Sequence, residues 1–136
     1  MREFVDFARL RRPGTPNSCL LAPDGLCQHA KPDIAAPTIK KSAEALYRRL
    51  LGLAGQRRDW SDLACRDDTR QIRFTARTPI LRFRDDVDIQ VFVMPGAEPQ
   101  QIGSQLAIYS RSRLGYSDLG VNRRRIISLL AMLPKS

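Results

Sequence analysis

Cysteine and histidine are scarce in this sequence of 136 residues, which contains three cysteines and one histidine. Cys19, Cys27 and Cys65 lack the CxxC spacing that is typical of zinc sites, and His29 does not complete a convincing site with them. We therefore predict that the protein holds no metal and no cofactor. Whether Cys19 and Cys27 form a disulfide stays open, because their spacing allows either a short closed loop or two free thiols.

Long apolar runs are also absent. No stretch approaches the roughly 20 apolar residues that a membrane-spanning helix needs. The first twelve residues include Arg2, Glu3, Asp6, Arg9, Arg11 and Arg12, and a signal peptide does not have this composition. The sequence as written therefore predicts a cytoplasmic chain without a membrane span, although these absences do not fix its localisation.

Signatures of the common catalytic sites are missing as well. No serine stands in the context of a nucleophile elbow, and no glycine-rich phosphate loop is present. Histidine, which is the most frequent general base, does not occur near the aspartates of residues 85–88. These absences favour a binding or accessory protein over an enzyme.

Positive charge, by contrast, is abundant. The net charge is +9, and its excess is concentrated in residues 40–58 and 89–136. Clustered cations attract the phosphates of nucleic acids and lipids. However, arginine far outnumbers lysine among the 23 basic residues, a bias that GC-rich codon usage alone produces. We favour this compositional explanation and expect no nucleic-acid partner, which leaves a small anion or a protein as the open alternatives.

The distribution of prolines and glycines divides the chain at about residue 37. Residues 1–37 carry these residues at a density that excludes a long helix or a central strand, so they predict an extended arm packed on the domain. Residues 38–136 predict an α+β domain that begins with an amphipathic helix, which starts near Ser42 and ends at Gly52 or Gly55. Strands follow at about 60–65, 72–77, 87–93 and 104–112. We expect one domain, with an antiparallel sheet of three to four strands and two helices on one face.

The C-terminal helix is predicted from apolar residues at helical spacing. Its expected buried stripe consists of Leu119, Ile126, Leu130 and Leu133, widened by Ile127 and Leu129. Asn122 and Arg123 lie between Leu119 and Ile126, so this stripe places both on the side that faces the core. Arg124 is expected to point outward, and Arg125 lies toward the edge of the stripe.

Residues 83–89 and 112–125 carry the most specific pattern in the chain. The first segment reads FRDDVDI, and the second reads SRLGYSDLGVNRRR, with Leu114, Val121 and Arg124 at variable places. Together they resemble the bacterial and plastid family called domain of unknown function 1499. The arm resembles the same family through Pro16-Asn17 and Gly25-Leu26-Cys27. The resemblance implies a fold and no established activity.

The chain departs from the family pattern at three places. Tyr109 stands where we expect an arginine, Arg111 where a small residue is usual, and Asp88 where glutamate is common. Many relatives also carry an apolar segment before the arm that this sequence lacks. Their placement in the cell envelope is therefore not transferred to this chain.

The connection between the last strand and the last helix is the candidate site. Gly115 permits a tight turn, Ser117 or Asp118 can cap the helix, and free N–H groups of its first turn can bind an anion. The candidate anion site comprises Arg113, Gly115, Tyr116, Ser117, Asp118, Asn122 and Arg123. The alternative, which we favour, is a structural network in which Arg113 and Arg123 pair with Asp85 and Asp86.

Three further readings of the same region remain as alternatives. Asp85 and Asp86 could serve a hydrolase as paired carboxylates, and Asp86 with Asp88 could offer oxygen ligands to a divalent cation. The outward face of the sheet could stack bases. That face would present Arg73, Arg77, Gln90, Phe92, Tyr109 and Arg111. The alternative to base stacking is that this face is an ordinary solvated surface.

Overall fold

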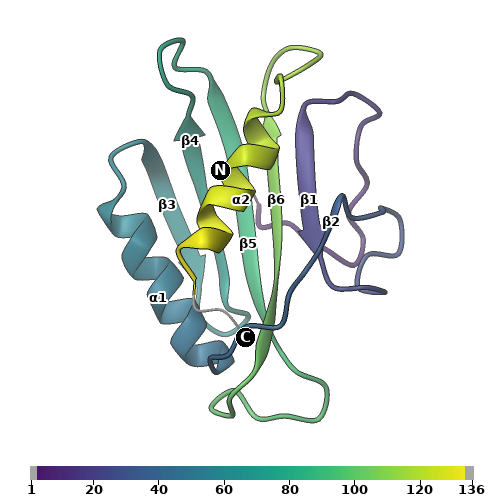
Figure 1. Cartoon of the computed structure of the whole chain (residues 1–136), viewed down its shortest axis with the longest axis vertical. Helices are drawn as coiled ribbons and strands as arrows, with labels where there is room; N and C mark the ends of the chain where they lie inside the picture. Colours follow the sequence, from purple (N-terminus) through teal and green to yellow (C-terminus); the bar gives the residue numbers. More distant parts are fainter. Residues whose placement is uncertain (1–2, 134–136) are drawn as a thin grey trace.

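The structure is a computed structural model, and it describes residues 3–133. Eight elements follow one another along the chain. They are β1 (Ser18–Ala22), β2 (Ile34–Ala35), α1 (Ala43–Gln56), β3 (Trp60–Arg66), β4 (Gln71–Arg77), β5 (Arg84–Val93), β6 (Ser104–Ser112) and α2 (Val121–Ala131). Figure 1 shows both helices on one side of a single twisted sheet.

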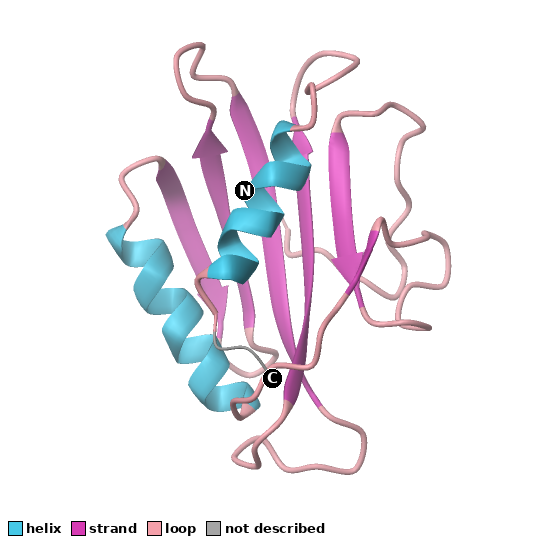
Figure 2. Cartoon of the chain, in the orientation of Figure 1, coloured by secondary structure: helices cyan, strands magenta, loops and turns pink. Residues whose placement is uncertain are grey.

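The sheet has six strands in the order β2-β1-β6-β5-β4-β3. Strand β1 pairs with β2 in parallel, and every other neighbouring pair is antiparallel. The expectation of an antiparallel sheet with three to four strands is therefore wrong, although the fold is α+β. The arm supplies the two additional strands, and β1 lies inside the sheet between β6 and β2 (Figure 2).

The sequence pattern does not predict strand β1, because the strand is short and buried on both faces. Its four residues from Cys19 to Ala22 are all buried, so the apolar residues do not alternate with polar ones. Proline and glycine surround this run but leave residues 18–22 free of both. The prediction that the arm excludes an interior strand is therefore wrong, because five residues suffice for one.

The face of the sheet beneath the helices holds the main core. Helix α1 begins after Ser42, whose hydroxyl accepts a hydrogen bond from the backbone N–H of Ala45 at 3.1 Å, as expected for this start. The helix does not stop at Gly52 or Gly55 but continues to Gln56. Leu46, Tyr47 and Leu50 of α1 pack in this core with Ile126 and Leu129 of α2.

The arm covers the opposite face of the sheet, where it forms a second, smaller core. Phe7 of the arm is 2% exposed there and packs with Leu20 and Tyr109. Gln71 donates a hydrogen bond to the carbonyl oxygen of Val5 at 3.0 Å, which holds the arm on β4. Tyr109 and Arg73 are consequently buried, so the face that we considered for base stacking is not an open surface.

Helix α2 has a different buried stripe from the predicted one. Its inward residues are Asn122, Ile126 and Leu129, followed by Leu133 after the helix. Leu119 is 84% exposed, because Gly120 has a φ of +81° and the helix begins only at Val121. The true stripe excludes Arg123, which is exposed; its predicted inward position is wrong. Asn122 faces the core as expected.

No helix within residues 3–133 is long and apolar enough to cross a membrane.

Candidate functional site

Two loops lie at the same end of the sheet and frame the candidate site. The β4–β5 loop spans residues 78–83, and the β6–α2 loop spans residues 113–120. Because β4, β5 and β6 are antiparallel neighbours, the last residues of β4 and β6 and the first residues of β5 lie at the same end of the sheet. Figure 1 shows both loops at the top of the molecule.

A groove of about 560 Å³ lies between these loops and the first turn of α2. We call it the loop groove. It is lined by Thr78, Pro79, Ile80, Leu81, Phe83, Ser112, Ser117, Asp118, Leu119, Val121 and Arg124. Its volume is within the range of small-molecule sites, which runs from roughly 300 to 1,000 Å³. Most of its lining is apolar, so its shape and chemistry suit an apolar group.

Large apolar side chains are exposed to an unusual extent on the two loops. Ile80 is 96% exposed, and Leu119 is 84% exposed. The set of exposed large apolar residues on these loops comprises Ile80, Leu81, Phe83, Leu114, Tyr116 and Leu119. Elsewhere among residues 3–133, the exposed large apolar residues are Leu63, Ile102 and Ile127. Contiguous exposed apolar surface of this kind marks interaction sites.

The backbone of both loops is strained at these same positions. Ile80, Arg82 and Leu119 have φ angles of +40°, +59° and +54°. Residues other than glycine seldom adopt positive φ, and a β-branched residue such as isoleucine does so at the greatest cost. Neither burial nor backbone preference therefore explains why position 80 holds isoleucine. The remaining explanation is a contact that the exposed side chain makes with another molecule.

Beneath the groove, Asn122 is the centre of a buried hydrogen-bond cluster. Its side-chain NH₂ donates to the carbonyl oxygen of Asn17 at 3.0 Å, to Ser112 Oγ at 3.0 Å and to Asp118 Oδ2 at 2.7 Å. Its Oδ1 accepts from Ser110 Oγ at 2.6 Å and from Arg125 Nη1 at 2.8 Å. One side chain thus joins the arm, β6, the β6–α2 loop and α2, which fixes the wall of the groove.

Asp118 caps helix α2 from inside the β6–α2 loop. Its carboxylate accepts hydrogen bonds from the backbone N–H of Gly120 at 2.8 Å and of Asn122 at 3.1 Å. Burial of Asp118 raises its pKa, but the hydrogen bonds from Asn122 and Gly120 outweigh this effect and hold the pKa below its ordinary value. The N–H groups that we considered for an external anion therefore already bind a carboxylate of this chain.

Asp85 and Arg125 form a buried ion pair under α2. Arg125 Nη2 lies 2.8 Å from Asp85 Oδ2, and the side chain of Asp85 is fully buried. The contact joins opposite charges, but neither oxygen of Asp85 has a hydrogen bond of good geometry within residues 3–133. The partner of Asp85 is therefore Arg125, two residues after the predicted Arg123. The predicted stripe through Leu119 places Arg123 on the buried side, whereas the observed stripe through Asn122, Ile126 and Leu129 places Arg125 there.

Asp86 belongs to a separate contact on the opposite face of the sheet. Arg113 donates to Asp86 Oδ1 from Nε at 3.1 Å and from Nη2 at 2.9 Å, and it also donates to Thr75 Oγ1 at 3.0 Å. Neighbouring residues of a strand point to opposite faces, so Asp85 and Asp86 cannot act on one substrate as a pair. Asp88 on the same face as Asp86 binds Arg111, with 2.7 Å between Oδ2 and Nη1.

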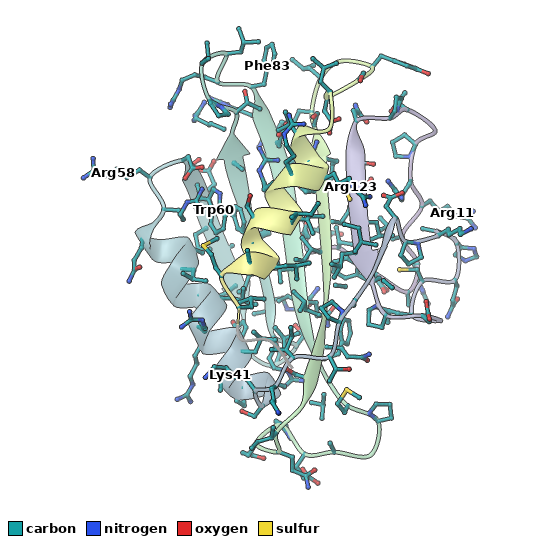
Figure 3. All side chains as sticks on the ribbon, in the orientation of Figure 1. Arg11, Lys41, Arg58, Trp60, Phe83 and Arg123 are labelled. Carbon is teal, nitrogen blue, oxygen red and sulfur yellow. The ribbon has the colours of Figure 1, made fainter. Side chains whose placement is uncertain are left out.

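The predicted anion site is therefore only partly brought together. Asp118 and Asn122 are in direct contact, and the carbonyl oxygen of Gly115 accepts a hydrogen bond from Asn17 at 2.8 Å. Ser117 accepts from the N–H of Leu119 at 3.3 Å, and Tyr116 is 71% exposed. Arg113 turns to the face of the arm, and Arg123 is exposed on α2 (Figure 3).

The loop groove was not predicted from the sequence. Its apolar residues occur in a stretch that lies between two strands and lacks a regular period, so they predict neither a strand nor a helix. The signal that was present is the Ile80-Leu81 pair in a connecting loop, since apolar pairs are uncommon at exposed turns. No group of three or more His, Cys, Asp or Glu within residues 3–133 could hold a metal ion.

Arginine dominates the charge around the groove. Residues 77–84 and 112–125 together contain seven arginines and a single aspartate, Asp118. Arg124 lines the loop groove and also a smaller polar hollow beside it, of about 240 Å³. Its Nη1 donates to the carbonyl oxygen of Leu119 at 3.0 Å, and within residues 3–133 no carboxylate pairs with it. Arg124 thus makes no salt bridge in the described part of the chain, although Asp118 lines the same groove and Asp59 lines the hollow.

Comparison with known proteins assigns the chain to a family. Searches among curated proteins and among solved structures found no match. A family model described as "Protein of unknown function (DUF1499)" matches residues 11–133, which covers both groove loops, the arm from residue 11 and the Asn122 cluster. The chain therefore belongs to the DUF1499 family.

Proposed function

We propose that this DUF1499 protein is a non-catalytic binding protein, and that its loop groove takes an amphiphilic anion. The apolar part of the ligand lies between the β4–β5 and β6–α2 loops. Its anionic group meets Arg124 at the junction between the groove and the polar hollow. The observation that carries the proposal is Arg124, which makes no salt bridge within residues 3–133 and lies on the wall of a largely apolar groove.

The polar motif has a structural part in this proposal. Asp118 and Asn122 consume their hydrogen-bonding capacity within the chain, so they hold the groove wall instead of contacting the ligand. This arrangement supports a site that exists before the ligand arrives, since the β6–α2 loop is fixed to both β6 and the arm. A preformed groove loses little conformational entropy on binding.

The arrangement of carboxylates supports binding over catalysis. Asp85 does not line the groove, is fully buried and faces Arg125. Asp86 lies on the other face of the sheet in contact with Arg113. A hydrolase would need a carboxylate within hydrogen-bond reach of its substrate, and neither residue lines the groove. Asp118 does line the groove, but it accepts hydrogen bonds from Gly120 and Asn122 and serves as the cap of α2.

Titration with decyl phosphate and decanol tests this proposal. Both probes have the same apolar chain, and only decyl phosphate is an anion. Trp60 is the single tryptophan and lines the polar hollow next to Arg124, so its fluorescence reports on the site, while calorimetry gives the affinity. We expect saturable binding of both probes, with decyl phosphate bound roughly tenfold more tightly because of its charge-assisted contact with Arg124.

Two variants separate the apolar and ionic contributions. Arg124→Gln is expected to remove the preference for decyl phosphate and to leave decanol binding unchanged. Arg123→Gln is the matched control, because Arg123 is its exposed neighbour and does not line the groove. Val121→Phe fills the groove and is expected to abolish binding of both probes. Absence of saturable binding, or full binding by the Val121→Phe protein, would overturn the proposal.

A further inference from the structure

We infer that the end of the molecule formed by the two loops docks on the surface of a bilayer that contains anionic lipids. This inference goes beyond the binding of a soluble ligand in the groove, because it concerns the exposed apolar surface of both loops, which includes Leu114 and Tyr116 outside the groove. We call these side chains and the arginines around them the loop tip. It consists of the exposed parts of residues 77–84 and 113–124.

The apolar part of the loop tip extends beyond the groove. Leu114 is 82% exposed and Tyr116 is 71% exposed, and neither lines the groove. They join Ile80, Leu81 and Phe83 at the same end of the sheet, where Figure 3 shows Phe83 on the β4–β5 loop at the top of the molecule. Leucine, phenylalanine and tyrosine are residues that interfacial segments place at the boundary between headgroups and acyl chains.

Arginines surround these apolar residues on both loops. The exposed Arg82 and Arg84 flank Phe83 on one loop, and the exposed Arg123 follows the other loop in the first turn of α2. The acidic residues of this end have partners within the protein: Asp85 is buried, Asp86 contacts Arg113, and Asp118 caps α2. Asp59, just before β3, is partly exposed but forms an ion pair with Arg57. The exposed arginines of the loop tip therefore outnumber its carboxylates, which is complementary to anionic headgroups.

The geometry of the loop tip favours a bilayer over a protein partner. The exposed apolar residues lie on two separate connecting loops that extend past the strand ends, as Figure 1 shows. Such protruding side chains can each insert between lipids while the arginines at their base remain at headgroup level. A protein partner would need a separate pocket for each loop. It would also need carboxylates placed opposite the arginines at the rim of the interface.

The strained residues give independent support. Ile80 combines an exposed fraction of 96% with a positive φ, and Leu119 combines 84% with a positive φ. Within the folded chain, each would be replaced at lower conformational cost by asparagine or glycine. An apolar surface outside the chain that contacts these side chains provides the reason for retaining them.

Vesicle sedimentation tests the inference with the full chain. The probes are vesicles of phosphatidylcholine alone and vesicles that contain phosphatidylcholine and phosphatidylglycerol. We expect binding to the mixed vesicles and weaker binding to phosphatidylcholine alone. Leu114→Ser together with Tyr116→Ser is expected to lower the partition coefficient roughly tenfold or more, since each side chain loses its contact with acyl chains. Arg82→Gln is expected to lower it roughly fivefold, through loss of one cation near the surface.

Matched controls exist at other exposed positions of the same molecule. Ile102 is 79% exposed in the β5–β6 loop at the opposite end of the sheet, so Ile102→Ser is expected to leave vesicle binding unchanged. Lys40 is exposed and follows Ile39, which pairs with Ser104 at the end of the sheet opposite the loop tip, so Lys40→Gln serves as the charge control. Loss of binding in the control variants equal to that in the loop-tip variants would overturn the inference.

Other outcomes distinguish this inference from the proposed function. Leu114 and Tyr116 lie outside the groove, so their variant is expected to bind decyl phosphate normally. Decyl phosphate binding without any vesicle binding would overturn the bilayer inference and leave the groove proposal intact. Self-association of the parent chain in gel filtration that disappears in the Leu114→Ser, Tyr116→Ser protein would assign the loop tip to a second copy and would also overturn the inference.

Discussion

Arg125 of α2 lies 2.8 Å from the carboxylate of Asp85 on β5, and the exposed fractions of the two side chains are 12% and 0%. The guanidinium also donates to Ser110 Oγ at 3.1 Å and to Asn122 Oδ1. Arg125 therefore links a buried charge to the buried hydrogen-bond cluster that supports the loop groove.

Removal of Arg125 is expected to destabilise the fold strongly. Arg125→Ala leaves Asp85 as a buried carboxylate without a cation, which typically costs about 3–5 kcal/mol in the free energy of unfolding. Arg123→Ala, two residues away and exposed, is expected to change it by less than about 0.5 kcal/mol. Urea denaturation of both variants measures the difference. Equal stabilities would show that the pair is not shielded from water as the structure indicates.

Asn122→Ala tests the buried cluster directly. The substitution removes the partner of Ser110, Ser112 and the carbonyl oxygen of Asn17 in a place without solvent. We expect a loss of about 2–4 kcal/mol in the free energy of unfolding. Ser128→Ala on the exposed side of the same helix is the control. Thermal denaturation of the two variants gives the comparison. Because alanine is the better helix former at both positions, a loss of similar size in both variants would contradict the special role of Asn122.

Acid is expected to weaken the cap of α2 at Asp118. The pKa of this carboxyl in the folded protein is below its ordinary value, so Asp118 contributes stability above the pKa of about 3.9 in the unfolded chain. That contribution is lost as the pH falls below about 4 and through the pKa of the folded state. Asp118→Asn, which does not titrate, is expected to be less stable at pH 7 and to lose less stability between pH 4 and pH 2. Urea midpoints across this range measure both; parallel curves would contradict the assignment.

The three cysteines are expected to differ in reactivity. Cys19 lies in the core under the helices, whereas Cys27 packs with the core under the arm, so the two thiols face opposite sides of the sheet and do not form a disulfide in this fold. Burial and the nearby Asp33 raise the pKa of Cys19 to about 11, and burial also raises the pKa of Cys27. Iodoacetamide is therefore expected to label the exposed Cys65 first and Cys19 only after denaturation. Peptide mass spectrometry gives the order, and a Cys19–Cys27 crosslink in native protein would contradict it.

Relief of backbone strain is expected to stabilise the β4–β5 loop. Ile80→Asn places a residue that tolerates positive φ at a position with φ of +40° and no packing to lose. We expect an increase of about 1 kcal/mol in the free energy of unfolding. Leu81→Asn is the control, because Leu81 is exposed without a positive φ. The same Ile80→Asn protein is expected to bind anionic vesicles less well, so a gain in stability together with a loss in binding is the result that connects strain to function.

The elements with regular local patterns were predictable from the sequence. Helix α1 and strands β4, β5 and β6 follow the apolar periods of 3.6 and 2 residues, and Ser42 marks the start of α1. Strand β3 has a weaker pattern, which a shift of register between Ser61 and Ala64 interrupts. Strand β1 was not predictable in the same way, because its short run is apolar on both faces. Coverage of the second sheet face by the arm depends on long-range contacts such as that of Phe7 with Tyr109, which no local pattern reveals.

The candidate site was predictable in part. Asn122 faces inward as the helical spacing indicated, but the stripe was assigned from Leu119, which lies outside the helix. Arg123 and Arg125 are two residues apart, which is about 200° around a helix, so the misassigned stripe puts the wrong arginine on the buried side. The loop groove depends on which strand ends meet, and this follows from the sheet topology instead of the sequence of either loop.

The three departures from the family pattern lie together in space. Asp88 is the cross-strand neighbour of Tyr109, and Arg111 both binds Asp88 and covers the Tyr109 ring, with 4.6 Å between its guanidinium carbon and the ring centroid. The family pattern predicts an arginine at position 109, where this chain has tyrosine. Here Arg111, two residues further along the same strand face, binds Asp88, and the ring of Tyr109 packs in the core under the arm.

The pairing of β1 with β6 has a consequence for how the chain acquires its structure. Leu21 pairs with Ile108 and Ser18 pairs with Arg111, so the strand nearest the N-terminus cannot pair until β6, near the C-terminus, is present. Closing a loop of this length must precede any gain from the contact, and such pairings slow folding. During synthesis, the buried residues of the arm emerge long before β6 exists. The arm therefore closes over the sheet only once almost the entire chain has been made.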